Sequence, residues 1–298
     1  MNKVLGNRKA ILLFVLPAGI LFTALVFVPL IWSFTYTFFS GQPGLNFQFS
    51  GLKNYARIFT DHTLWITIKN NLIYVVLVGG FQIILGFGIA MLINYGVKKR
   101  QNLVRSLLFI PVVLPGVAVA QMFLKIYAIT PQHGLLNSFF DIIGMENLVK
   151  AWTGDPQTAM LALIIMDIWK AVGMYVLVFY SGIIELPEDS VEAARIDGAS
   201  TFQIITRIQI PQLKPVFRMA LIICITACFK VYDSVVALTG GGPGTSTMMP
   251  SMYMYNTAFN YSEFGYGSVL ALIILIECVI FTSVVGRLFR SKENGQEG

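Results

Sequence analysis

Charged residues are scarce in this sequence. Asp, Glu, Lys and Arg together make up 12% of its 298 residues, whereas hydrophobic residues make up 56%. Soluble domains carry about 25% charged residues. The composition therefore excludes an ordinary soluble domain and predicts an all-α integral membrane protein that crosses the bilayer several times.

Histidine and cysteine are also scarce, and neither is clustered. His62 and His133 lie far apart, and Cys224, Cys228 and Cys278 fall inside apolar segments. Thiols in such segments are typically small packing residues. We therefore expect no disulfide framework, no metal site and no cofactor bound by this chain.

The sequence also lacks the motifs of an enzyme. No cluster of a nucleophile with a base is present, and the glycine-rich residues 240–245 lack the Gly-Lys-Ser/Thr ending of a phosphate-binding loop. We therefore expect neither catalysis nor ATP hydrolysis by this chain. Any energy from ATP would have to come from a separate subunit.

Long uncharged or nearly uncharged runs indicate six membrane spans. Each run can supply the roughly 20 residues that a bilayer core requires. The first is too long for the core of a signal peptide, which has about 7–15 residues, so we expect it to be retained. The predicted spans are residues 11–39, 70–97, 106–124, 156–184, 216–238 and 264–289.

The basic residues predict the orientation. With a cytoplasmic N-terminus, 14 of the 21 Lys and Arg residues fall on the cytoplasmic side, 5 on the other side and 2 within spans. This bias follows the positive-inside rule. Both termini and the loop at residues 185–214 are therefore predicted to be cytoplasmic. The net charge of +6 then reflects topology and not nucleic-acid binding.

The polar residues 185–214 read as two short helices joined at a sharp turn. Gly198 can adopt the left-handed conformation that ends a helix. Ser200 and Gln203 have the spacing of a capping box, which predicts a second helix that Pro211 should close. A helix–glycine–helix elbow on the membrane surface is a suitable docking shape. We call residues 185–214 the elbow.

The elbow resembles a known motif. Its sequence contains Glu-Ala-Ala at 192–194, a glycine at 198 and Ile-x-Ile-Pro at 208–211. This spacing is similar to the EAA loop of binding-protein-dependent ABC importers, which usually has Leu in place of Ile210. The resemblance implies that the elbow fits a cleft on an ATPase subunit. It assigns this coupling role to Glu192, Ala193, Ala194, Asp197, Gly198 and Pro211.

Other segments resemble the carbohydrate-uptake branch of this family. Residues 229–233 read FKVYD, and residues 238–244 read LTGGGPG. The resemblance implies the type I ABC importer permease fold, with six transmembrane helices in a prokaryotic cell membrane. It also implies a second permease in a heterodimer, a cytoplasmic ABC ATPase dimer that binds ATP and Mg²⁺, and an extracytoplasmic solute-binding protein. Residues 1–10 would be a cytoplasmic N-terminus, 11–290 the permease domain and 291–298 a cytoplasmic polar tail.

Charged residues inside the predicted spans are candidates for a substrate path, because they are costly unless they line a cavity or pair. Asp167 with Lys170, and Lys230 with Asp233, have a spacing of three residues and could instead form ion pairs within a helix. Aromatic side chains nearby could stack on the C–H faces of a sugar. The candidates are Asp167, Trp169, Lys170, Tyr175, Lys230, Tyr232, Asp233 and Glu277.

The sequence indicates the class of the transported solute but not its identity. Asp167 and Asp233 balance Lys170 and Lys230, which favours a neutral sugar or oligosaccharide over glycerol phosphate or another polar solute. An ATP-independent secondary carrier is the other alternative. Such a carrier would be expected to show internal inverted repeats, and the sequence shows none.

Overall fold

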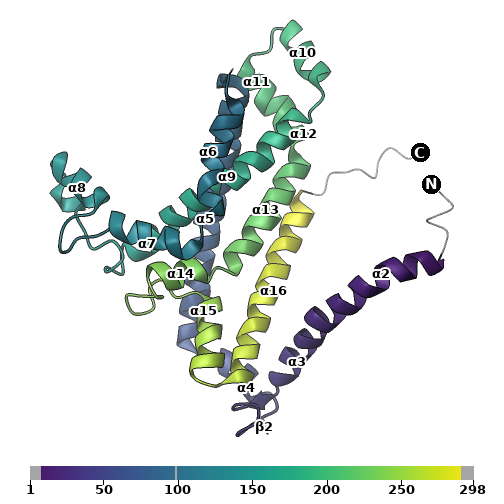
Figure 1. Ribbon diagram of the computed structural model, residues 1–298, viewed down its shortest axis with the longest axis vertical. Coiled ribbons are helices and arrows are strands. Elements are labelled where there is room, and N and C mark those ends of the chain that lie inside the picture. Colours follow the sequence, from purple (N-terminus) through teal and green to yellow (C-terminus); the bar gives the residue numbers. More distant parts are fainter. Residues whose placement is uncertain (1–7, 98, 290–298) are drawn as a thin grey trace. The chain divides into compact units, whose positions relative to one another are not determined.

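The computed structural model describes residues 8–97 and 99–289 (Figure 1). Most of the predicted N-terminal segment and the whole predicted tail therefore lie outside the described residues. The chain divides into two compact units. The smaller unit contains the residues up to Asp61 together with Tyr253–Ile273, and the larger contains His62–Met252 and the residues from Ile274 on. We describe each unit by itself.

The smaller unit begins with a long apolar helix. α2 (Arg8–Phe22) continues through a π-helical segment, η1 (Thr23–Phe27), into α3 (Val28–Tyr36). Pro29 lacks the N–H that the carbonyl of Leu25 would otherwise accept, which accounts for the altered hydrogen bonding just before it. Large apolar side chains are exposed on all sides of this helix. A helix that is apolar all round suits a lipid environment.

A hairpin and short helices complete the smaller unit. β1 (Phe39–Ser40) pairs antiparallel with β2 (Gln48–Phe49), with Phe39 opposite Phe49. α4 (Lys53–Ile58) follows, and its Asn54 donates to the carbonyls of Thr37 and Phe39. The second half of α15 (Pro250–Tyr255), η4 (Asn256–Asn260) and the first residues of α16 (Phe264–Leu288) belong here as well. The hairpin is a small exception to the predicted all-α fold.

The larger unit is built around two long helices. α5 (His62–Gly96) packs along α9 (Ala159–Ile184), and glycines allow close approach. A Cβ at Gly86 would lie 2.6 Å from the Cβ of Tyr175, and one at Gly173 would overlap the carbonyl oxygen of Leu108. The remaining helices are α6 (Gln101–Val113), α7 (Gly116–Ile126), α8 (Leu135–Ile142), η2 (Glu146–Leu148), α10 (Glu188–Ile196), α11 (Thr201–Ile204), η3 (Ile205–Gln209), α12 (Ile210–Gln212), α13 (Lys214–Phe229) and α14 (Asp233–Leu238).

Four helices are long and apolar enough to cross a bilayer by themselves. They are Ile11–Tyr36, His62–Gly96, Ala159–Ile184 and Phe264–Leu288. Two bent pairs, Gln101–Val113 with Gly116–Ile126 and Thr201–Gln212 with Lys214–Phe229, bring the number to six if each pair counts as one span. The structure thus has four to six candidate spans, which agrees with the predicted six when each bent pair counts as one. The third and fifth predicted spans are not straight helices.

The third predicted span breaks at Pro115. Leu114 is extended, with φ −72° and ψ 139°, because a residue before proline avoids the helical conformation. α7 then leaves α6 at 96° (Figure 1). The fifth predicted span breaks between Phe229 and Asp233, and α14 packs against α7 and α9. Both breaks place polar backbone and charged side chains next to α9.

Candidate functional site

The first half of the elbow is a helix that ends as the sequence predicts. α10 has Glu188 and Asp189 in its first turn, where carboxylates favour the positive end of the helix dipole. Gly198 follows it with φ +81°. The amide of Ala199 donates to the carbonyl of Ala194, and that of Gly198 to Arg195, which is the Schellman pattern of a helix end.

The second half of the elbow begins with the predicted capping box. The amide of Gln203 donates to Ser200 Oγ at 3.3 Å, and the amide of Ser200 donates to Gln203 Oε1 at 2.8 Å. The prediction that Pro211 closes this helix is wrong, because the helical run continues to Gln212. η3 changes the hydrogen-bonding register before α12, so Pro211 falls in a first turn that needs no N–H from it.

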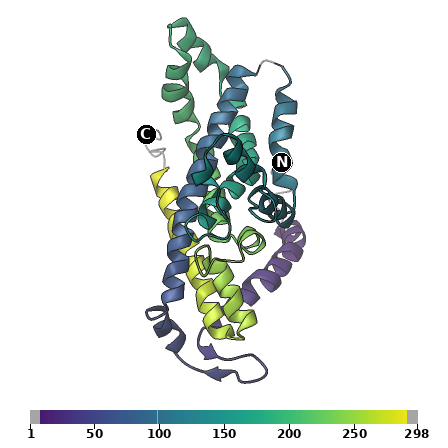
Figure 2. The same cartoon turned by 90° about the vertical axis from the view of Figure 1, so that its left-hand side faces the viewer.

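The elbow lies at one end of the larger unit (Figures 1 and 2), and most of the residues that the resemblance assigns to coupling are exposed there. Glu192, Ala193, Asp197, Gly198 and Pro211 are exposed, and Ala194 is half-buried. Ile196 is 87% exposed and Phe202 is 74% exposed. Each helix of the elbow therefore has one large, exposed apolar side chain, which is typical of a surface that a partner covers.

A buried polar centre surrounds Asp167 in the middle of α9. Asp167 is only 6% exposed. Its carboxylate accepts hydrogen bonds from Tyr74 of α5 at 2.7 Å and from Ser234 of α14 at 2.6 Å. Gln82 of α5 donates to the backbone carbonyl of Asp167 at 2.9 Å. Asp167 therefore joins three helices and is buried among them.

Neither Asp167 with Lys170 nor Lys230 with Asp233 forms the ion pair that a spacing of three residues allows. Among the described residues, Arg57 and Glu263 form an ion pair, and His133 contacts Asp141. Lys170 instead directs its Nζ to the start of α7, 2.9 Å from where a Cβ at Gly116 would lie, and Asp233 approaches the same glycine. Lys170 Nζ and Asp233 Cβ thus both lie near the Cβ position of Gly116, next to the break in the third predicted span.

The remaining path candidates do not form one cluster. Trp169 is 40% exposed and its ring lies 5.5 Å from that of Phe123, whereas Tyr175 is buried against Gly86. Tyr232 is half-buried and Lys230 is exposed. One oxygen of Glu277 is buried and has no hydrogen-bond partner among the described residues. Those residues contain no group of three His, Cys, Asp or Glu side chains that could hold a metal.

The sequence did carry a signal for the partners of Asp167. Asn71, Tyr74 and Gln82 interrupt an apolar run at spacings of three and eight residues, which places them near one face of α5. All three are buried, and Asn71 donates to the carbonyl of Cys228 at 3.2 Å. Buried polar side chains need partners, so this face could have been matched to the charged residues of α9. Ser234 gave no such signal.

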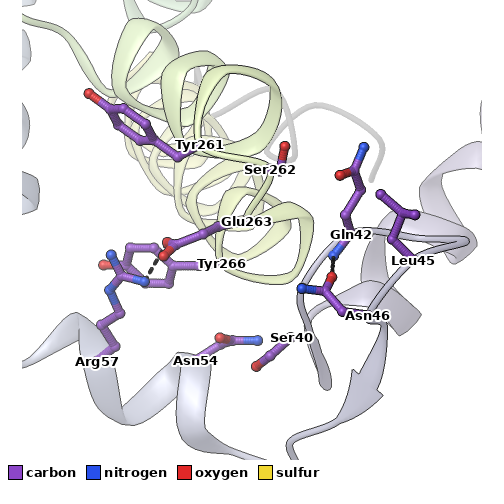
Figure 3. A pocket seen from close by; sticks show the side chains of 11 residues that line it. Ser40, Gln42, Leu45, Asn46, Asn54, Arg57, Tyr261, Ser262, Glu263 and Tyr266 are labelled. Carbon is purple, nitrogen blue, oxygen red and sulfur yellow. Dashed lines mark hydrogen bonds and ion pairs between the residues drawn. The ribbon is translucent and has the colours of Figure 1, made fainter.

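A second polar site lies in the smaller unit, in a cavity of about 350 Å³ that we call the hairpin pocket (Figure 3). Arg57 Nη1 lies 2.5 Å from Glu263 Oε2, and its guanidinium lies 4.0 Å above the ring of Tyr266. The other residues that line the pocket are Ser40, Gly41, Gln42, Leu45, Asn46, Asn54, Tyr261 and Ser262.

The charged groups in and near the hairpin pocket have hydrogen-bonding partners. Burial alone would lower the pKa of Arg57, but the hydrogen bond and charge of Glu263 outweigh it and raise that pKa. Asp61 accepts from the hydroxyls of Tyr253 and Tyr266, each at 2.6 Å. Burial and this bond to Asp61 raise the pKa of Tyr253. The pocket therefore offers neutral amide and hydroxyl groups around a closed ion pair.

Comparison with known proteins identifies the family. Residues 82–293 match the family described as "Binding-protein-dependent transport system inner membrane component". The chain is 32% identical over 291 residues to the probable ABC transporter permease protein YurN of Bacillus subtilis, covering 96% of this chain and 97% of YurN. It is 32% identical over 245 residues to the trehalose/maltose transport system permease protein MalF of Thermococcus litoralis, covering 81% of each chain.

A solved structure shows the same fold. A chain of a bacterial ABC transporter involved in the import of the acidic polysaccharide alginate superposes with a TM-score of 0.82 at 22% sequence identity. The match covers 96% of this chain and 97% of that one. This confirms the predicted permease fold. Together with the family match, it shows that the chain belongs to the inner-membrane components of binding-protein-dependent transport systems, as a permease subunit of an ABC importer and not an enzyme itself.

Proposed function

We propose that this chain is one half of a heterodimeric transmembrane channel that imports a sugar, and that its elbow couples the channel to a separate cytoplasmic ATPase dimer. ATP binding would close the ATPase dimer, draw the two elbows together and turn the cavity outward. A solute-binding protein would then release sugar into the cavity. Hydrolysis would reopen the ATPase and turn the cavity inward, because each ATPase state binds one elbow arrangement better.

The observation that carries this proposal is the combination of rigidity and exposed apolar surface in the elbow. The Schellman turn at Gly198 and the capping box at Ser200 fix both helices locally. On either side of this turn, Ile196 and Phe202 remain exposed. A docking lever has to be stiff, and apolar anchors at its centre supply most of the binding energy in typical interfaces.

The first test is purification of this chain from detergent-solubilised native membranes, with co-purifying proteins identified and ATPase activity assayed. We expect a second permease and an ATPase, and we expect Glu192→Ala and Ile196→Ser to weaken the ATPase association. Ile142→Ser is the matched control, because Ile142 is 83% exposed in α8, outside the elbow. A chain that binds no ATPase would contradict the proposal and favour an ATP-independent carrier.

A neutral sugar is the cargo that we propose. The MalF relative is named for trehalose and maltose, and Lys170 and Asp233 lie around Gly116 as opposite charges. With Asp167 occupied by Tyr74 and Ser234, Trp169 and Tyr232 are the aromatic residues left to border the path. A screen of solutes for binding-protein-dependent stimulation of ATPase tests this. Stimulation by glycerol phosphate and not by neutral sugars would overturn the sugar assignment.

The hairpin pocket is our proposed contact for the solute-binding protein. The pocket is lined by Tyr261, Ser262 and Glu263. These residues end the Met/Tyr-rich segment 239–263, which contains no Lys or Arg and suits an adaptable partner interface. Tyr261 is 67% exposed. Tyr261→Arg should lower stimulation of the ATPase by the binding protein and leave the basal ATPase rate unchanged. Unchanged stimulation would remove the pocket from the docking surface.

A further inference from the structure

The second half of the elbow has a buried face that a regular α-helix would not produce. Ile204, Gln209 and Leu213 are each at most 3% exposed. Gln209 and Leu213 are four residues apart, as on one α-helical face, but Ile204 and Gln209 are five apart, which exceeds the three-to-four spacing of such a face. The π-helical segment η3 spans Ile205–Gln209 and adds one residue between Ile204 and Leu213. The extra residue brings Gln209 onto the buried face, in place of Ile208.

Gln209 finds one specific partner there. Its Oε1 accepts a hydrogen bond from the hydroxyl of Tyr95 at 2.9 Å. Tyr95 stands in the last turn of α5, 114 residues away in sequence. Of the hydrogen bonds between described residues, this is the one that joins the elbow to a helix distant in sequence. A buried glutamine amide is costly without a partner, so the contact holds the elbow in one position on α5.

α5 connects this contact to the buried polar centre. Tyr74 and Gln82 of the same helix bind Asp167 of α9. Tyr95 and Tyr74 are about 30 Å apart along the helix, at 1.5 Å per residue. α5 is one uninterrupted helix over this distance, so a displacement of its elbow end is transmitted as a rigid-body motion.

A similar contact at the same end of α5 does not involve the elbow. Gln101 donates from Nε2 to the carbonyls of Ile93 at 3.2 Å and Val97 at 2.7 Å. Its Oε1 accepts from the hydroxyl of Tyr180 at 2.7 Å. This second tyrosine–glutamine bond fixes α6 and α9 to α5. It has the same chemistry as Tyr95–Gln209 and touches no elbow residue, which makes it a matched control.

We propose that the Tyr95–Gln209 hydrogen bond transmits the motion of the elbow to α5. Tyr95 and Gln209 are positioning residues for transport, and η3 turns Gln209 toward α5. This inference rests on the proposed function, because it takes the elbow to be driven by an ATPase. It adds the step between the docking surface and the membrane helices.

The test uses the complete transporter with its own ATPase and solute-binding protein, reconstituted in liposomes. Solute uptake and binding-protein-stimulated ATP hydrolysis are measured for Tyr95→Phe, Gln209→Met and the double variant. Since a neutral hydrogen bond contributes about 0.5–1.5 kcal/mol, uptake per ATP should fall about twofold to twelvefold in each single variant. The double variant should fall no further, because both changes remove one bond. Gln209→Glu keeps an acceptor and should retain more than half of the wild-type ratio.

Tyr180→Phe is the control and should leave uptake per ATP unchanged. The inference is wrong if both single variants keep the wild-type ratio, if uptake and hydrolysis fall in parallel, or if the losses add in the double variant. Should Tyr95→Phe fail to assemble, Gln209→Met carries the same test from the elbow side. A wild-type chain that recruits no ATPase would contradict the proposed function itself, whereas a coupled wild type with an unaffected Tyr95→Phe ratio would contradict only this inference.

Discussion

The elbow and the buried polar centre are both polar sites in the larger unit, but they are held together over different distances in sequence. The capping box and the turn at Gly198 use hydrogen bonds between residues three to five positions apart. The carboxylate of Asp167 is bound by residues 67 and 93 positions away. The turn and the helix cap of the elbow are thus specified locally, and Gln209 adds one distant contact, to Tyr95. The polar centre exists only when three helices have packed.

This difference predicts different consequences of substitution. Damage to a local element should change the elbow and its coupling while the helices stay packed. Damage to the polar centre should loosen α5, α9 and α14 together, because each contributes a hydrogen-bonding group. The predictions that follow test this distinction.

The largest expected effect is from Asp167→Leu. The change leaves the buried hydroxyls of Tyr74 and Ser234 without their acceptor, at a cost of about 2–5 kcal/mol in stability. Thermal denaturation of the purified protein in detergent measures this cost. Asp167→Asn is the matched control, because its amide oxygen still accepts, and it should lose less than half as much. Normal stability of Asp167→Asn with abolished transport would instead return Asp167 to the substrate path.

The same distinction explains how much could be predicted from sequence. The turn at Gly198, the capping box at Ser200 and the exposed Glu192 depend on neighbours in the chain, and the structure confirms them. The long uncharged runs gave the spans, yet not the 96° bend at Pro115. Asp167 was assigned to the path because its charge is visible in the sequence, whereas the helices that supply Tyr74 and Ser234 are known only once packed.

The next effect in size is from Gly198→Val. No atom lies within 4 Å of a Cβ at Gly198, so the change adds no clash. Its cost arises from the left-handed backbone alone, about 1–2 kcal/mol for a residue with a Cβ and more for a β-branched one. We expect a complex that assembles in the membrane with at least tenfold lower transport.

The control for this prediction is Gly198→Asn, since asparagine tolerates the left-handed conformation. It should transport at close to the wild-type rate. Uptake by membrane vesicles, compared with the amount of assembled complex, separates loss of coupling from loss of protein. Full transport by Gly198→Val would exclude the turn from the coupling mechanism.

The smallest expected effect is from Ser200→Ala, which removes the side-chain acceptor of the Gln203 amide. Loss of a helix cap costs about 1 kcal/mol, so the Gln203 amide should exchange its hydrogen with solvent about fivefold faster. Ser200→Asn supplies another capping oxygen and should keep the wild-type rate. Because the capping box is local, amides around Asp167 should retain their protection in both variants. Faster exchange around Asp167 in Ser200→Ala would show that the two sites are coupled already in the resting protein.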